Sequence, residues 1–233
     1  MESKVFVLFL LVCVYGQDTN IGEDNFSYPC DSLTLDCVRN YFKDTGLCTE
    51  ASHEDGQPIQ KDREMTYVPR INVTIDSYEA VLTFYGTGIE AFYINKDTNN
   101  LVMAVSSEGI NLYSPRTNYY IDQRAREPLV VQDYVNNTYF SVLTAVIPSA
   151  GKEGIDGTKV SAYNTQAIPI LNLGPEITKS SNPAVQKVYQ GFLDDIPASV
   201  EELLLTKAPY FFYNYLQNYI CDFGFEFVGE IKH

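Results

Sequence analysis

The sequence predicts an α+β protein in which antiparallel strands occupy the middle of the chain and a long helix comes last. Two patterns predict this order. Apolar residues alternate strictly from Val68 to Asp76, as in a half-buried strand. From Val200 to Tyr219 they recur every three or four residues, as on one face of a helix. With 45% hydrophobic and 20% charged residues among 233, the composition is typical of a globular protein.

The first residues predict a secretory signal peptide over residues 1–16. Lys4 precedes an apolar run of about ten residues, which is too short for a bilayer span of about 20. Val14 and Gly16 then occupy the positions that a signal peptidase requires before Gln17. A buried core helix is the alternative interpretation. We therefore expect a secreted, extracellular protein.

Strand candidates follow one another through the middle of the chain, with turn residues between them. Their lengths are typical of an antiparallel meander. The run 139–147 is apolar on both faces, so it must be covered on both sides or line an interior space. The candidates are 68–76, 81–85, 89–95, 101–106, 110–113, 118–122, 129–134, 138–147 and 159–171.

Two helices are predicted near the C-terminus. Asn182 is a suitable N-cap with Pro183 at the first helical position, which opens a helix to about Asp195. A second helix runs from about Ala198 to Ile220, roughly 35 Å at 1.5 Å per residue. Apolar residues cover more than half of its circumference, so we expect neighbouring elements to enclose it. An ordinary core helix on a flat sheet is the alternative.

Four cysteines follow the predicted signal peptide, which in an oxidising compartment indicates two disulfides with three possible connectivities. Cys30 and Cys37 are the expected first pair. On one straight helix their Cα atoms would lie about 10.5 Å apart, beyond the roughly 7 Å limit for a disulfide, so the intervening chain must turn back. Cys48 and Cys221 remain, either bridged, free or bonded to another molecule.

Three asparagines, Asn25, Asn72 and Asn136, begin Asn-x-Ser/Thr sequons. A sequon predicts N-glycosylation when its asparagine faces solvent in a secreted protein. Asn72 has independent support, because it falls on the polar face of the alternating strand candidate.

The charge balance and a motif search exclude several classes of function. A formal net charge of −14 argues against nucleic acid and against an anionic membrane surface as partners. P-loop, GxGxxG, GxSxG and HExxH motifs are absent. His53 lies in a polar loop without partner ligands, and Asp194 and Asp195 are better explained as helix-end charges. We expect no enzyme activity, metal or cofactor, with a carboxylate-based hydrolase as the remaining catalytic alternative.

The Cys-x6-Cys spacing of Cys30 and Cys37, the signal peptide, the strand-rich middle and the long C-terminal helix resemble the takeout and haemolymph juvenile-hormone-binding protein family of insects. Residues 192–202 are similar to the family's helix entry. The resemblance implies one domain over residues 17–233, in which a strongly curved antiparallel sheet wraps the long helix. It also implies an elongated apolar tunnel for a terpenoid hormone, fatty acid or similar lipid.

One departure narrows the resemblance. The hormone-binding branch has a disulfide between the later strands and the C-terminal helix, whereas no cysteine lies between Cys48 and Cys221 here. The chain therefore resembles the broader takeout-like group.

These features predict a secreted carrier of a small hydrophobic ligand, without catalysis and without stable membrane insertion. Burial of each CH2 group of such a ligand contributes about 0.8 kcal/mol, and the 18 tyrosines offer apolar area with a hydroxyl. A secreted protein-interaction factor with a filled core is the second hypothesis. The candidate lining residues are Phe192, Phe211, Phe212 and Tyr215 on helices and Phe140, Val142 and Tyr163 on strands, each of which is equally compatible with a solid core.

Overall fold

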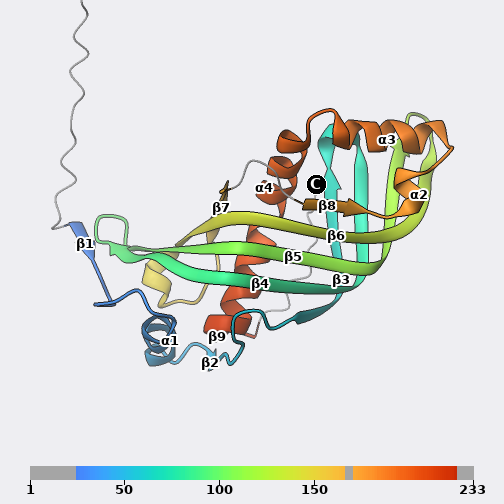
Figure 1. Cartoon of the computed structure of the whole chain (residues 1–233). Coiled ribbons are helices and arrows are strands. Elements are labelled where there is room, and N and C mark those ends of the chain that lie inside the picture. Colours follow the sequence, from blue (N-terminus) through green and yellow to red (C-terminus); the bar gives the residue numbers. More distant parts are fainter. Residues whose placement is uncertain (1–24, 166–169, 225–233) are drawn as a thin grey trace, which may run out of the picture.

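The structure is a computed structural model that describes residues 25–165 and 170–224 (Figure 1). The predicted signal peptide lies outside these ranges. The strands are β1 (Phe26–Ser27), β2 (Thr49–Glu50), β3 (Ile59–Val68), β4 (Val73–Asn95), β5 (Asn100–Gln123), β6 (Arg126–Ile147), β7 (Lys159–Asn164), β8 (Ile170–Leu173) and β9 (Cys221–Asp222). The helices are α1 (Leu35–Asp44), α2 (Pro175–Thr178), α3 (Pro183–Leu193) and α4 (Ile196–Tyr215).

Seven strands form one antiparallel sheet around the three long strands β4, β5 and β6. β1 and β3 pair with β4, while β7 and β8 pair with β6. Tight turns join the long strands, with Asn99 and Ala125 in the left-handed region at φ values of 54° and 58°. A large antiparallel sheet combined with a long C-terminal helix confirms the predicted α+β class.

The long strands join runs that the sequence pattern separates. Glycine and asparagine positions suggest breaks, but the hydrogen-bonded ladder continues through them. Gly88 pairs with Ser106, and Asn137 pairs with Leu112. The candidate 159–171 is instead divided into β7 and β8, and its residues 166–169 lie outside the described chain.

The predicted strand 68–76 is wrong at its start. Val68 ends β3, and the turn η2 (Pro69–Ile71) leads to Asn72 in the left-handed region at φ 54°. Proline provides no N–H for a strand ladder, and asparagine tolerates this backbone conformation. Strand β4 therefore begins only at Val73.

Irregular pairing occurs within the long strands, which change direction along their length in Figure 1. The register between β5 and β6 shifts between Ser114 and Thr117, and Pro115 falls inside this bulge. Glu79 in β4 has a φ of 53°. The Ser114 hydroxyl donates a hydrogen bond to the Tyr78 carbonyl oxygen at 2.8 Å, so a buried side chain satisfies the backbone beside the bulge.

Strand β6 is fully buried on one face only. Tyr139, Leu143 and Ile147 are buried, whereas the intervening Phe140 and Val142 are half-buried on the opposite face. The apolar run expected to need cover on both sides therefore contributes mainly to one core.

Helix α4 is buried around much of its circumference and contacts β3, β6 and β7. Asp195 caps its first turn by accepting a hydrogen bond from the Ala198 N–H at 3.1 Å. Pro209 lies inside the helix, which continues as the π-helical turn η4 (Leu216–Ile220). The predicted helix 198–220 is thus confirmed in position. None of the described helices combines the length and apolarity needed to cross a membrane.

Two disulfides fasten the N-terminal segment. Cys30 bonds to Cys37, with Cα atoms 5.9 Å apart, because α1 begins only at Leu35 and the chain before it turns back. Cys48 bonds to Cys221 near the pairing of β2 with β9. The expected first pair is confirmed, and the structure resolves the open alternatives for the second in favour of a bridge.

Candidate functional site

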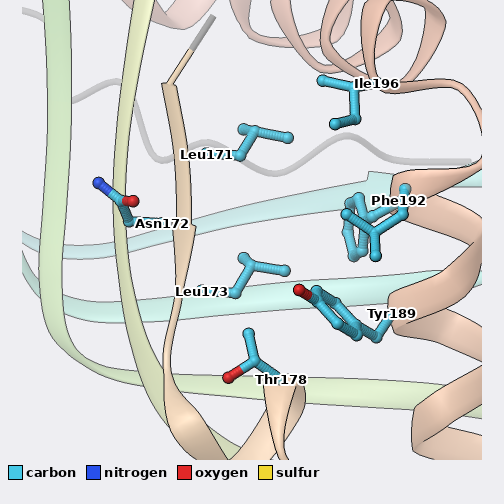
Figure 2. Close-up of a pocket in the computed structure, with 8 residues that line it drawn as sticks. Leu171, Asn172, Leu173, Thr178, Tyr189, Phe192 and Ile196 are labelled. Atoms are coloured by element: carbon cyan, nitrogen blue, oxygen red, sulfur yellow. The ribbon is translucent and has the colours of Figure 1, made fainter.

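A pocket of about 320 Å³ lies between β8, α2 and α3 (Figure 2). This volume is at the lower end of the range for small-molecule sites, roughly 300–1,000 Å³. Most of its wall is apolar, and none of the lining side chains in residues 25–165 and 170–224 is charged. The lining residues are Leu171, Asn172, Leu173, Thr178, Tyr189, Phe192, Leu193 and Ile196.

Strand β8 supplies one wall of the pocket. It pairs with β6, so Leu173 lies opposite Val135. Alternation along the strand sends Leu171 and Leu173 toward α3, while Asn172 points to the other side of the strand (Figure 2). The two leucine side chains therefore form an apolar surface facing the helix.

Helix α3 and the start of α4 supply the opposite wall. Asn182 caps α3 by accepting a hydrogen bond from the Ala184 N–H at 2.9 Å. Helical spacing then places Tyr189 and Phe192 on the side facing β8, and Ile196, the first residue of α4, completes this wall (Figure 2). Phe192 is only 3% exposed, so it belongs both to the pocket wall and to the core behind it.

The connection between β8 and α2 is held by an acidic side chain from β6. Asp133 accepts a hydrogen bond from the Ile177 N–H at 3.0 Å. A Cβ atom at Gly174 would lie 1.6 Å from Asp133 Oδ1, so only glycine fits this close approach. Thr178, on the pocket side, donates its hydroxyl hydrogen to the Gly174 carbonyl oxygen at 3.0 Å.

The structure does not bring the seven predicted lining residues together. Phe192 lines the pocket. Phe140 and Val142 occupy the half-buried outer face of β6, and Tyr163 on β7 is 60% exposed. These three strand residues therefore lie away from the space between the sheet and the helices.

The three predicted residues on α4 are packed among other rings. The Phe211 ring lies 5.3 Å from that of Tyr139, and the Tyr215 ring lies 5.4 Å from that of Phe84. Phe212 is fully buried. Aromatic contacts of this kind stabilise a closely packed core.

The sequence analysis did not predict most residues of the pocket wall, and of those that line it only Phe192 was among the candidates. The available signals were the Leu-x-Leu alternation of Leu171 and Leu173 and the helical spacing of Tyr189 and Leu193. Each signal is short and common, and only the fold brings the two together.

An ion pair between Glu64 on β3 and Lys207 on α4 lies in the interior, with side-chain exposures of 2% and 4%. The Thr66 hydroxyl also donates to Glu64 Oε1, while Oε2 has no hydrogen-bond partner within the described part of the chain. Burial lowers the pKa of Lys207, and the carboxylate opposes this shift. Burial also raises the pKa of Tyr139 and Tyr210, so these hydroxyls resist ionisation at alkaline pH.

Two further acidic residues, Asp76 and Asp195, have structural partners. Asp76 accepts a hydrogen bond from Arg63 Nε at 2.7 Å, on the face opposite to Glu64 because it pairs with Met65. Glu64 and Asp76 therefore do not form a facing pair of the kind a glycosidase uses. Asp195 caps α4, in agreement with the interpretation of helix-end charge.

No metal-binding arrangement emerges in the ranges that the structure describes, where three or more His, Cys, Asp or Glu side chains never gather. His53 lies beside Tyr219, with ring centroids 5.8 Å apart, and its carbonyl oxygen accepts a hydrogen bond from Arg39.

The three sequon asparagines differ in environment. Asn72 is exposed at the η2 turn, where its side chain accepts a hydrogen bond from the Tyr67 hydroxyl at 2.6 Å. Asn25 donates to Asp97 at 3.1 Å. Asn136 lies within β6, half-buried, and accepts a hydrogen bond from Asn111 at 2.8 Å.

Comparisons with known proteins leave the family open. No family model matches the sequence, and no curated protein matches it significantly. The resemblance to the takeout family rests on the sequence features described above, and the function it implies is a proposal.

Proposed function

We propose that this protein is a secreted carrier that binds a small hydrophobic ligand between β8 and α3. The observation that carries the proposal is the pocket itself. Six of its lining side chains are leucine, isoleucine, phenylalanine or tyrosine, and its volume of about 320 Å³ suffices for a small apolar molecule. Removal of apolar ligand surface from water favours binding at such a wall.

Secretion is supported by the two disulfides, which persist in oxidising compartments. The takeout-like architecture is supported by the burial of α4 against several strands of the sheet. In this proposal the curved sheet encloses α4, as the resemblance implies. A tunnel running along α4 would require Phe211, Phe212 and Tyr215 to move, and the pocket beside α3 is therefore the proposed ligand site.

The proposal is tested with the full chain secreted from eukaryotic cells. Native mass spectrometry is expected to show a mass excess beyond glycans, and solvent extraction to release an apolar molecule of matching mass. The purified, extracted protein is also expected to enhance the fluorescence of N-phenyl-1-naphthylamine saturably. Absence of both an extractable molecule and saturable probe binding would contradict the carrier function.

A matched pair of variants locates the site. Leu193→Asp introduces a charge into the pocket wall at a residue that is 42% exposed, so the core remains intact. Leu205→Asp is the control, because Leu205 lies on α4, is 50% exposed and does not line the pocket. We expect Leu193→Asp to weaken probe binding by about tenfold or more, since an unpaired carboxylate is costly in an apolar site. Equal effects of the two substitutions would contradict the assignment.

A protein-interaction function is the second candidate. Aromatic rings fill the contact between α4 and the sheet, while Tyr85, Tyr113, Tyr134 and Tyr163 are exposed on the strands. Tyrosine is enriched in protein interfaces. The same native mass spectra discriminate the two functions, because an interaction factor is expected to retain a protein partner and no small ligand.

A further inference from the structure

We propose that the pocket between β8 and α3 selects a neutral molecule with a single hydrogen-bond-accepting group, such as an ester, and discriminates against a carboxylate. This inference rests on the proposed function and narrows the class of ligand. It follows from three features of the described pocket residues: the lack of charge among them, the one hydroxyl donor that they leave available and their acidic surroundings.

The first feature is the absence of a counter-ion. None of the eight lining residues in the described part of the chain is a lysine, arginine or histidine. An ionised carboxylate that enters an apolar site without a cation or several donors loses its hydration without compensation. Lys179 follows Thr178 in sequence and is exposed, but it is not a lining residue.

The second feature is the small set of side chains in the wall that can form hydrogen bonds. The Thr178 hydroxyl donates its hydrogen to the Gly174 carbonyl oxygen, and the Asn172 side chain points to the other side of β8 (Figure 2). The Tyr189 hydroxyl points into the pocket toward β8, and it makes no hydrogen bond with the described residues (Figure 2). Tyr189 therefore offers one donor, which suits one acceptor atom on an otherwise apolar ligand.

The third feature is the surrounding charge. Asp133 supports the β8–α2 connection next to the pocket. The whole chain carries a formal net charge of −14, which repels anions approaching the protein. Both the local and the long-range fields therefore favour a neutral ligand over an anionic one.

The test compares three ligands of equal chain length at pH 8: decane, methyl decanoate and decanoic acid, each measured by displacement of N-phenyl-1-naphthylamine. We expect methyl decanoate to bind at least about tenfold more tightly than ionised decanoic acid. We also expect Tyr189→Phe to weaken binding of methyl decanoate by about threefold to tenfold, as for the loss of one hydrogen bond. The affinity for decane, which accepts no hydrogen bond, is expected to stay the same.

The outcomes separate this inference from the carrier function. Decanoic acid binding as tightly as the ester, or ester binding unchanged in Tyr189→Phe, would overturn the selectivity while the carrier function stands. Acid binding that is tight and is lost in Lys179→Gln would overturn it by identifying a cation at the pocket rim. Failure of all three ligands to displace a bound probe, or of the probe to bind, would count against the carrier function itself.

Discussion

Lys207 and Glu64 place opposite charges inside the protein, and each depends on the other for compensation. We expect Lys207→Met to lower the free energy of unfolding by about 3–5 kcal/mol, because Glu64 would remain buried and unpaired. The double variant Glu64→Met with Lys207→Met is expected to recover most of this loss. Denaturant unfolding at pH 7 measures both, and a single variant as stable as the wild type would refute the prediction.

Gly174 is a second residue with a specific role, because its missing side chain admits Asp133 to the β8–α2 connection. We expect Gly174→Ala to cost about 1–3 kcal/mol through overpacking and to weaken probe binding at the adjacent pocket. Gly109→Ala is the control, since its Cβ would meet its nearest neighbour, Thr138 Cγ2, at an ordinary 3.5 Å. Melting temperatures and probe titrations provide the comparison, and equal behaviour of the two variants would argue against the steric explanation.

At the scale of elements, the two C-terminal helices α3 and α4 were predictable because their signals are local, whereas α1 and α2 were not predicted. The caps at Asn182 and Asp195 and the periodic apolar positions all lie within a few residues of the helices they define. The strands were harder to predict. Pairing between residues distant in sequence keeps β4, β5 and β6 continuous across their glycine, proline and asparagine positions.

The candidate site was largely unpredictable for a related reason. Apolar periodicity identifies the most deeply buried face of a helix, so it selected Phe211 and Phe212, which pack in the core. Residues that line a pocket remain partly uncovered, as Tyr189 and Leu193 do. Phe192 was predicted because it belongs to both sets.

The two disulfides constrain elements at very different separations in sequence. Cys48 and Cys221 are 173 residues apart, whereas Cys30 and Cys37 are 7 apart. Chain-entropy arguments give about 5 kcal/mol for the long loop and about 2.5 kcal/mol for the short one. We expect the Cys48→Ser/Cys221→Ser variant to unfold at a lower denaturant concentration than the Cys30→Ser/Cys37→Ser variant. The reverse order would show that local packing outweighs the entropy of the unfolded chain.

At the scale of the whole molecule, buried tyrosines determine the response to alkaline pH. Burial raises the pKa of Tyr119, Tyr139 and Tyr210, and it raises that of Tyr219 to about 12. Above the unfolded value of about 10, the native state therefore holds more protons than the unfolded state. The contribution of these protonated tyrosines to the free energy of unfolding is fully present below about pH 10 and is lost as the pH rises through 12.

Denaturant unfolding at a series of alkaline pH values measures this loss. Ultraviolet absorbance of tyrosinate, recorded in parallel, is expected to show part of the tyrosines ionising only when the protein unfolds. Complete and reversible ionisation without loss of native circular dichroism would contradict the burial of these hydroxyls.

The proposed carrier function requires a neutral apolar ligand to occupy the space between β8 and α3. Photo-crosslinking tests this most directly, with a methyl ester of a diazirine-bearing decanoic acid and mass-spectrometric mapping of the labelled peptides. We predict that label concentrates in residues 171–178 and 189–196, and that unlabelled methyl decanoate competes it away. Label confined to other parts of the molecule, or label that the competitor does not reduce, would contradict the assignment of the ligand site.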